Sequence, residues 1–361
     1  QSVGGNFDDV VGNHQADTTM VAQISADRTK INLVSIPRDS LVDVPQCETS
    51  KGTIPAQYNV MFNSIFAGAY KTGGDLSSAA SCTLNAVNSL TGLNIQNFIV
   101  VDFAGLVKMI DSVGGVDLCI PQNVNDPYTG LNLDKGMHHL DGVAATQYAR
   151  IRHGIGDGSD TSRTTRQQYL IKQLMSEALS KNLFTDTAQL YQLAKSALKS
   201  LNISQGMADT AALAGLAMSL KNFTMTNLQT QTVPVVPAPS DPNRSVWTDE
   251  ADNLWEKMRA GKPIFDTADS NSGDSSDTSS DNSASSDDSG TTDSNQSDTT
   301  AETPDPVTGL ITKSDGTLVD PSTGGTVDPD DGSIHDATTG QYIGLADRYL
   351  NATVCAVPAK N

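Results

Sequence analysis

The stretch "TTMVAQISADRTKINLVSIPRDS" spans residues 18–40 and decides the fold class. Two β-rich runs, 18–26 and 30–37, are separated by the polar triplet Asp-Arg-Thr, a pattern typical of a β-hairpin. The second run ends in a proline, which cannot donate a ladder hydrogen bond. Arg38 and Asp39 therefore follow the end of a strand, where α/β proteins commonly place their binding groups.

The first 262 residues continue with strands and helices in alternation. Apolar residues recur at helical spacing in most segments and form short β-rich runs in the others. Expected strands are 97–103, 116–121 and 223–235, and expected helices are 58–70, 76–92, 104–115, 141–152, 161–180, 186–200, 208–220 and 246–261. Strands interleaved with helices indicate an α/β (α+β) layered domain.

Composition divides the chain into three parts. The formal net charge is −19, yet residues 263–312 hold eleven acidic residues and no Lys or Arg, so residues 1–262 carry only −4. We expect one large folded domain at 1–262, a disordered Ser/Asp/Thr-rich linker at 263–304 and a turn-rich repeat tail at 305–361. Because the acidity lies after residue 262, it does not argue against anion binding by the first part.

The tail contains a degenerate repeat. The segments "DPVTG" (305–309), "DPSTG" (320–324) and "DATTG" (336–340) carry turn signals at similar spacing. Between the first two, "LITKSDGTLV" (310–319) is typical of a hairpin with an Asp-Gly turn. A weakly ordered spacer is the simpler interpretation, and a small β module that contacts wall glycans is the alternative.

Four cysteines are present, and none forms a Cys-x-x-Cys pair, so a zinc site is not indicated. An even number fits two disulfides in an exported protein, although it fits four free thiols almost as well. We favour Cys82–Cys119, because the helix and the strand that carry them flank one strand–helix unit. Cys47–Cys355 then follows by elimination.

Two features concern the compartment. No run of about 18 apolar residues occurs, so no segment of this sequence is expected to span a membrane. The sequence starts with Gln1 rather than Met, so we expect an N-terminal portion, which could hold an anchor, to be missing.

Arginines gather around one loop. Arg150, Arg152, Arg163 and Arg166 fall within seventeen positions, and Arg38 could join them. Two of them stand in the first turn of the long helix, where the helix dipole disfavours cations unless an anion is bound. Guanidinium groups bind phosphate oxygens bidentately, so a phosphate site is indicated. Solvated helix faces or simple ion pairs are the alternative. Nucleic acid is not an expected partner, because no helix-turn-helix or basic patch of that type is visible.

Four motifs occur in order: "ADTTMVAQISADRTKINLVSIPRDS", "NFIVVDFAGLVKMIDSVGGVDLCIP", "GLNLDKGMHHLDGVAATQYARIRHG" and "DTSRTTRQQ". Over roughly residues 10–235 the chain resembles the LytR–CpsA–Psr family of envelope glycopolymer transferases of Gram-positive bacteria. The resemblance implies an extracytoplasmic enzyme, usually tethered by an N-terminal transmembrane helix. Such enzymes move a glycopolymer phosphate from a polyprenyl-pyrophosphate carrier to a peptidoglycan hydroxyl. The implied fold is a central mixed β-sheet flanked by helices, with an apolar tunnel for the lipid.

The resemblance also assigns residues. The pyrophosphate-binding arginines of the family fall on Arg38, Arg150, Arg152 and Arg163, and a glutamine of its last motif falls on Gln167.

Two further assignments concern the metal and the base. Asp17 matches an aspartate that helps to position Mg²⁺ in the family, and phosphoryl transfer depends mainly on positioning and charge neutralisation. Asp39 is our candidate for a general base near the attacking hydroxyl.

Three departures from the family pattern stand out. Gln15 replaces an arginine next to Asp17, and Gln57 stands where the family often has a lysine two residues before an asparagine. A second magnesium-site aspartate, in a "G-x-D" motif, is expected to precede Gln1. We therefore expect an incomplete metal site in this chain.

Two other functions remain open at this point. A pyrophosphatase would act on the same lipid carrier with water as the acceptor. A non-enzymatic cell-wall-binding or regulatory protein would use the tail repeats as its adhesive part.

Overall fold

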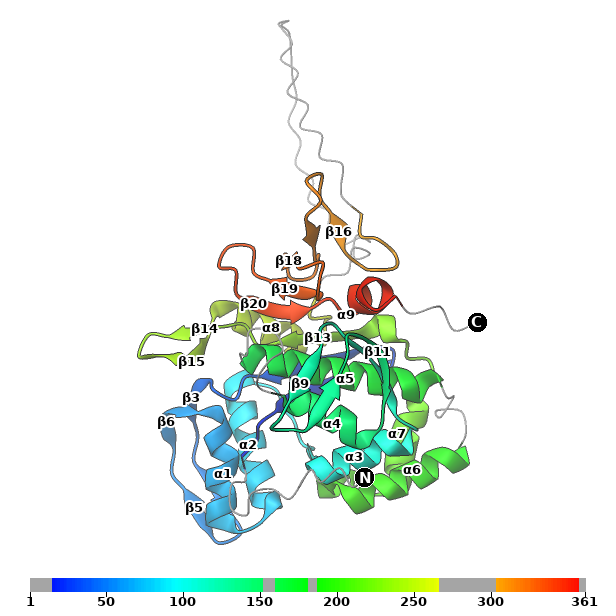
Figure 1. Ribbon diagram of the computed structural model, residues 1–361. Helices are drawn as coiled ribbons and strands as arrows, with labels where there is room; N and C mark the ends of the chain where they lie inside the picture. Colours follow the sequence, from blue (N-terminus) through cyan, green and yellow to red (C-terminus); the bar gives the residue numbers. More distant parts are fainter. Residues whose placement is uncertain (1–14, 152–159, 181–186, 266–302, 357–361) are drawn as a thin grey trace, which may run out of the picture.

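A computed structural model describes residues 15–151, 160–180, 187–265 and 303–356 (Figure 1). The expected linker lies almost entirely outside these residues. At the centre is a mixed three-stranded sheet in the order β1-β2-β13. β1 (Thr19–Ile24) and β2 (Ile31–Ile36) form the expected antiparallel hairpin, and β13 (Leu228–Thr232) lies parallel to β2.

β2 is buried along its whole length, because helices cover both of its faces. Successive side chains of a strand point to opposite faces. Val34 and Ile36 accordingly pack into one apolar core, which we call the first core. Ile31 and Leu33 pack into another one, against apolar side chains of the long helix α5 (Asp160–Ser180).

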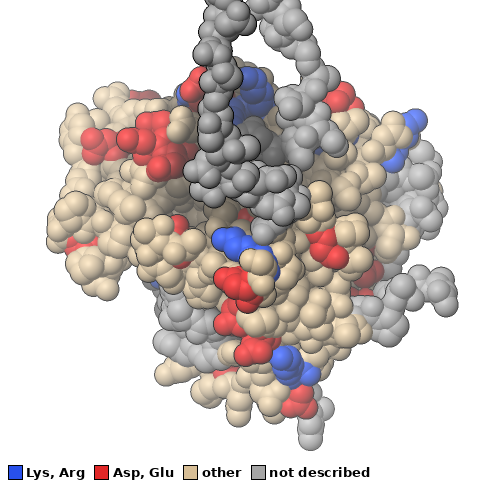
Figure 2. Space-filling model, turned by 90° about the horizontal axis from the view of Figure 1, so that it is seen from above, with Lys and Arg blue, Asp and Glu red and all other residues tan. Residues whose placement is uncertain are grey.

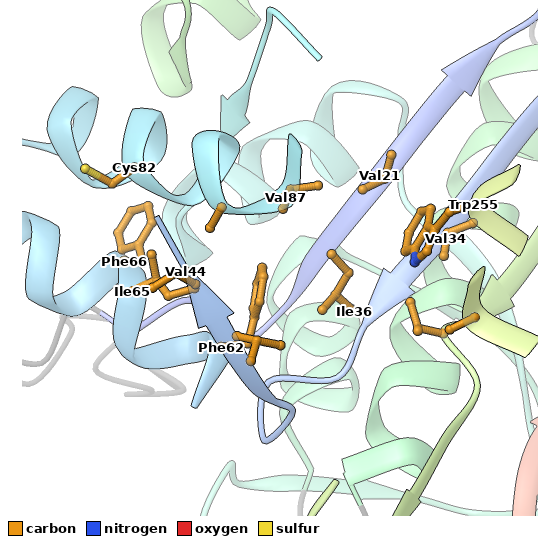
Figure 3. Close-up of a cluster of buried hydrophobic side chains, with 14 of the residues drawn as sticks. Val21, Val34, Ile36, Val44, Phe62, Ile65, Phe66, Cys82, Val87 and Trp255 are labelled. Atoms are coloured by element: carbon orange, nitrogen blue, oxygen red, sulfur yellow. The ribbon is translucent and has the colours of Figure 1, made fainter. Parts of the chain in front are cut away.

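The first core joins the sheet to three helices, α1 (Phe62–Gly73), α2 (Leu76–Thr91) and α8 (Asp249–Arg259) (Figure 3). Asp75 caps α2 by accepting from Ser78 N at 2.7 Å, and the helix ends at Gly92 in the left-handed conformation that glycine tolerates. The side chains drawn in Figure 3 meet in one cluster: Val21, Val34, Ile36, Val44, Phe62, Ile65, Phe66, Cys82, Val87 and Trp255.

Short strands extend this half of the molecule. β3 pairs with β6, β4 pairs with β5, and β14 pairs with β15, all antiparallel. Their bounds are β3 (Leu41–Val44), β4 (Cys47–Thr49), β5 (Gly52–Ile54), β6 (Gln57–Met61), β14 (Val235–Ala238) and β15 (Asp241–Trp247).

A second core lies on the side of α5 that faces away from the central sheet. It is built from α4 (Gly142–Arg150), α5 and the antiparallel pair β8 (Val116–Ile120) and β11 (Gly136–Leu140). The other elements of this half are β7 (Ile99–Val100), α3 (Phe103–Ser112), β9 (Val124–Asp126), β10 (Leu131–Leu133), α6 (Thr187–Ser200), β12 (Asn202–Ile203), the 3₁₀ turns Gln205–Met207 and Met225–Asn227, and α7 (Thr210–Ser219).

Two element predictions were wrong. Residues 58–61 continue a strand, because β6 pairs with β3, and the helix expected from residue 58 begins only at Phe62. The strand expected at 97–103 is reduced to the two residues of β7, and Ile99 is 47% exposed rather than buried. In the first case the pairing with β3 decides the conformation, and in the second Asp102 caps α3 by accepting from Gly105 N, so the expected strand ends early.

The C-terminal module, residues 303–356, folds as a β structure rather than as an irregular spacer. Asp305 shows how each turn closes: its carboxylate accepts from Thr308 N and Oγ1, and its carbonyl accepts from Gly309 N. The repeats at 320–324 and 336–340 form the same turn. Its elements are β16 (Ile311–Thr312), β17 (Leu318–Val319), β18 (Thr326–Val327), β19 (Ser333–His335), β20 (Tyr342–Leu345), α9 (Asp347–Tyr349) and a π-helical turn at Leu350–Val354, and the five strands form one antiparallel sheet in chain order.

The C-terminal module is docked on α5 (Figure 1). Leu350 is fully buried in the second core. Tyr169 of α5 accepts a hydrogen bond from Cys119 N at 2.9 Å and donates one to Asn351 Oδ1 at 2.6 Å. Lys172, one turn further along α5, forms an ion pair with Asp347 at 2.9 Å. The module is therefore part of the folded body and not an appendage.

The disulfide prediction was wrong in its pairing. Cys47 of β4 is bonded to Cys82 of α2, with their Cα atoms 5.6 Å apart, and Cys119 of β8 is bonded to Cys355, with 5.8 Å between Cα atoms. The favoured Cys82–Cys119 pair is excluded because Cys82 lies in the first core and Cys119 in the second. The docking of the C-terminal module brings Cys355 to β8.

Among the helices described, none is both long enough and apolar enough to cross a membrane.

Candidate functional site

The site begins where the central hairpin brings two chain segments together. Thr19 pairs with Ile36, so the residues just before β1 and just after β2 are neighbours. Asp17 and Arg38 occupy these positions and form an ion pair, with 2.9 Å between Asp17 Oδ1 and Arg38 Nη1. Their side chains are 38% and 20% exposed, so the pair is partly shielded from water.

The start of α5 lies against this pair. Arg163 is buried, and its Nη2 donates to the backbone carbonyl of Asp17 at 3.4 Å. Gln167, one helical turn later on the same face, accepts from Thr18 Oγ1 and donates to the carbonyl of Ala149 at 3.3 Å. Two of the residues predicted from sequence therefore meet Asp17 and Arg38 at one end of the sheet.

The end of α4, which carries Arg150, contacts the site through the carbonyl of Ala149, which accepts from Gln167. Asp141 caps that helix by accepting from Ala144 N at 2.8 Å, and Arg150 is its last residue. The Arg150 guanidinium stacks on the ring of Phe103, with 4.3 Å between Cζ and the ring centroid. Arg152 and the following loop lie outside the described residues.

Arg166 does not lie on the protein surface, which was one of the options that the sequence left open. It is buried, and it donates to Ile151 O at 2.6 Å and to Ser162 Oγ at 2.7 Å. Burial raises the pKa of the adjacent Tyr148 to about 12, so this hydroxyl stays neutral. Arg166 therefore fixes the start of α5 to the residue that follows α4.

Gln168 anchors α5 to the sheet. Its Nε2 donates to Ser35 Oγ at 2.7 Å and to Gln231 O and Thr232 Oγ1 at 3.3 Å each. These partners lie on β2 and β13, so the helix start has a fixed position relative to two strands. In the motif "RQQ", Gln167 thus faces the candidate site, while Arg166 and Gln168 hold the helix in place.

Arg244 is a site residue that the sequence analysis missed. It lies on β15, and its Nη1 is 3.4 Å from Asp39 Oδ1, while Arg38 Nε is 3.5 Å from Asp39 Oδ2. The hairpin that carries Arg244 was not predicted, and no helical or strand periodicity marks an arginine there. The available signal was the Pro-Ser pair at 239–240, a turn signal that stands between the Val-Val pair at 235–236 and the Ser-Val-Trp run at 245–247.

Asn63 is a second residue that the sequence analysis missed. Its backbone N donates to Arg38 O at 3.0 Å, and its buried Oδ1 has no hydrogen-bond partner among the residues that the structure describes. Gln57 and Asn59, by contrast, are exposed on β6, and Asn59 N donates to Asp43. The asparagine next to the site is therefore Asn63 at the start of α1.

The described residues offer few ligands for a metal. In the part of the chain that the structure describes, no group of three or more His, Cys, Asp or Glu side chains could hold an ion. Asp17 is the predicted ligand, and one of its oxygens is already engaged by Arg38. Mg²⁺ commonly uses one or two carboxylates together with substrate phosphates. The site therefore fits Mg²⁺ only if phosphate oxygens supply most of the ligands.

A cavity of about 540 Å³ opens between α1, α2 and the β3–β6 region. Ser64 and Ile65 line it, and they directly follow Asn63, which contacts the Arg38 backbone. Its volume falls in the range of small-molecule sites. Its other lining residues include Val44, Pro45, Ile54, Pro55, Val60 and Ala86, with Gln57, Lys71 and Thr72 as polar members.

Charged side chains at the site lie close to partners of opposite sign. Three guanidinium groups (Arg38, Arg163 and Arg244) lie with three carboxylates (Asp17, Asp39 and Asp241), of which Asp241 is the most exposed, at 42%. On the face seen in Figure 2, by contrast, Lys and Arg side chains stand singly among acidic ones. The guanidinium groups of the site are partly buried, where their field is less screened.

Comparison with known proteins gives consistent matches. A sequence profile of the LytR_cpsA_psr family matches residues 5–260. The chain is 29% identical over 230 residues to the cell wall biosynthesis protein LcpA of Corynebacterium glutamicum, which covers 62% of this chain and 43% of that protein. It is 28% identical over 169 residues to the polyisoprenyl-teichoic acid–peptidoglycan teichoic acid transferase TagU of Enterococcus faecalis, covering 46% and 48%. The chain thus spans about half the length of these curated relatives.

Solved structures match the same architecture. Crystal structures of B. subtilis TagV (TM-score 0.51, 21% identity, covering 67% of this chain and 87% of that one) and of protein gbs0355 from Streptococcus agalactiae (0.54, 17%, 68% and 80%) align with it. At these identities the match concerns the fold alone.

Proposed function

Because the chain belongs to the LytR_cpsA_psr family, we propose that it joins a cell-envelope glycopolymer to peptidoglycan by phosphoryl transfer. The donor is a glycopolymer on a polyprenyl-pyrophosphate carrier, and the acceptor is a peptidoglycan hydroxyl. Two relatives are named for cell wall biosynthesis and for teichoic acid transfer to peptidoglycan. The observation that carries the proposal is the convergence of Arg38 and Arg163 on Asp17 and of Gln167 on the adjacent Thr18.

Binding of the pyrophosphate is the first step. Arg38 and Arg163 neutralise its oxygens from two sides, and Arg150 and Arg152 add charge from the end of α4. Arginine suits this task because its planar fork matches two phosphate oxygens at once. Arg166 and Gln168 hold α5 in place, so Arg163 is oriented before the substrate arrives.

The chemical step exchanges one P–O bond for another. The acceptor hydroxyl oxygen attacks the phosphorus that bears the glycopolymer, and a phosphodiester forms. The P–O–P bond breaks, polyprenyl phosphate leaves with the bridging oxygen, and the hydroxyl proton passes to a base or to water. Charge accumulates on the leaving phosphate, where Arg38 and Arg163 stabilise it.

Asp17 would hold Mg²⁺ together with the pyrophosphate oxygens. The ion would supply additional charge neutralisation for the leaving phosphate. The cavity beside α1 is our candidate for the start of the polyprenyl chain, because most of the residues that line it are apolar and because Ser64, which lines it, directly follows Asn63. The two disulfides support an oxidising, extracytoplasmic location. Membrane attachment is part of the proposal and rests on the family resemblance.

The proposal is tested with purified protein, Mg²⁺, peptidoglycan and a labelled oligosaccharide on a polyprenyl pyrophosphate. We expect label linked to peptidoglycan through a phosphodiester, together with released polyprenyl phosphate. Free sugar phosphate in the presence of peptidoglycan would instead identify a pyrophosphatase. Label that binds peptidoglycan only non-covalently would favour a wall-binding protein.

Site variants sharpen this test. Arg38→Ala and Arg163→Ala should each weaken lipid-pyrophosphate affinity about 10- to 100-fold, the range for losing charge-assisted hydrogen bonds. Arg28→Gln is the matched control, because Arg28 is an exposed arginine at the opposite end of the same β1–β2 hairpin. Unchanged affinity in both site variants would show that the pyrophosphate binds elsewhere.

A further inference from the structure

The β14–β15 hairpin is aligned directly on the loop that carries Arg38. Ser40 and Ser245 form a parallel bridge, and Ser245 N donates to Asp39 O at 3.2 Å. Trp247 Nε1 donates to Ser40 Oγ at 3.2 Å. Backbone contacts, and not only an ion pair, therefore set the position of Arg244 relative to Asp39.

Each carboxylate oxygen of Asp39 faces a different arginine. Oδ2 is 3.5 Å from Arg38 Nε, and Oδ1 is 3.4 Å from Arg244 Nη1. Arg244 Nε is also 3.8 Å from Asp241, and Arg38 is paired with Asp17. Carboxylates and guanidinium groups therefore alternate from Asp17 to Asp241, and the middle members are less exposed than the two ends.

We infer that Arg244 is a positioning residue for the pyrophosphate site and that Asp39 connects it to Arg38. The inference rests on the proposed function and deepens it. A general base must present a carboxylate oxygen to the attacking hydroxyl. Both oxygens of Asp39 face guanidinium groups instead, so its role is to orient Arg38 and not to accept the proton.

The consequence for Arg38 is geometric. Its Nη1 donates a hydrogen bond to Asp17, and Asp39 lies 3.5 Å from its Nε as an ion-pair partner, so two carboxylates restrain the guanidinium from two sides. A fixed fork loses less side-chain freedom when it binds phosphate. Loss of Arg244 should release Asp39, let Arg38 reorient and weaken pyrophosphate binding, although Arg244 itself need not contact the substrate.

A double-mutant cycle tests this inference. Arg244→Gln, Asp39→Asn and the double variant are titrated with geranylgeranyl pyrophosphate in Mg²⁺, and kcat, KM and the pH–rate profile of transfer are measured. We expect each single change to weaken binding about tenfold and the double variant to be no weaker than the poorer single one, because neighbours in one network are not additive. Arg244→Lys should recover part of the affinity. Asn243→Ala, an exposed change in the same hairpin, should bind like the wild type.

Three results would overturn the inference. The first is a loss of affinity in the double variant that equals the product of the two single-variant losses, which would mean that Arg244 and Asp39 act independently. The second is a loss of 100-fold or more in kcat for Asp39→Asn with unchanged affinity and a lost acidic limb of the pH profile, which identifies a base. The third is wild-type affinity in Arg244→Gln. Thermal unfolding of each variant separates these effects from misfolding. Absent binding and transfer by the wild type would refute the proposed function itself.

Discussion

Removing the Cys119–Cys355 disulfide should destabilise the protein more than removing Cys47–Cys82. The paired change of Cys119 and Cys355 to Ala opens a ring closed across 236 residues, and the paired change of Cys47 and Cys82 opens one of 35. In the chain-entropy description, the first bond restricts the unfolded chain by about 5.5 kcal/mol and the second by about 3.8 kcal/mol. Measured losses fall below such values when the unfolded chain keeps structure, so the predicted quantity is the difference of about 1.7 kcal/mol.

The assay is urea unfolding of both variants and the wild type under non-reducing conditions. Tryptophan fluorescence follows the first core, which contains Trp255 with Trp247 packed against it. Far-UV circular dichroism follows the whole chain, and coincidence of the two signals checks that unfolding is two-state. A mass map of non-reduced peptides confirms which bonds are present. Equal losses in the two variants, or a larger loss for the Cys47 and Cys82 pair, would refute the reasoning.

Three further outcomes are expected. Tyr169→Phe removes the hydroxyl that joins Cys119 N to Asn351 and should cost about 1–3 kcal/mol of unfolding free energy, measured by urea titration. Leu350→Ala should cost about 2–5 kcal/mol in the same assay and expose the α5 face of the C-terminal module to hydrogen exchange. The hydrogen bond to Asp117 raises the pKa of His139 in the folded protein. The small stabilisation that protonated His139 adds to the free energy of unfolding is therefore complete below its unfolded-state pKa, and it is lost as the pH rises through the raised pKa of the folded state. The melting temperature should reflect that loss in the wild type and not in His139→Gln.

Local signals were enough for the central hairpin and the long helices. Residues 18–40 carry two β-rich runs and a polar turn, and α2 has an aspartate cap and a glycine stop, so neither needs distant information. The family motifs placed Asp17, Arg38 and Arg163 in one site, and the structure does bring these three together. Arg152 lies outside the described residues, so its placement stays a prediction.

Features set by distant contacts could not be predicted. The helix expected from residue 58 starts late because β6 pairs with β3, and helical spacing cannot reveal that pairing. The cysteine pairing failed because Cys355 reaches β8 only through the docking of the C-terminal module, and nothing near Cys355 in sequence encodes this docking. Arg244 enters the site on a hairpin whose register is fixed by Ser40, more than two hundred residues away. Sequence spacing carries no information at that range.

The Cys119–Cys355 bond also determines how mechanical force passes through the molecule. Tension applied on the C-terminal side of Cys355 enters β8 directly through the disulfide, and the chain between the two cysteines bears none of it. That protected segment includes α4 and α5, which carry Arg150 and Arg163. Roughly 800 Å of contour length stays unextended while the bond is intact and becomes available when it is reduced. When the oxidised protein is pulled at this end, Arg150 and Arg163 therefore stay outside the path of the force, whereas Asp17 and Arg38, which precede Cys119, lie in it.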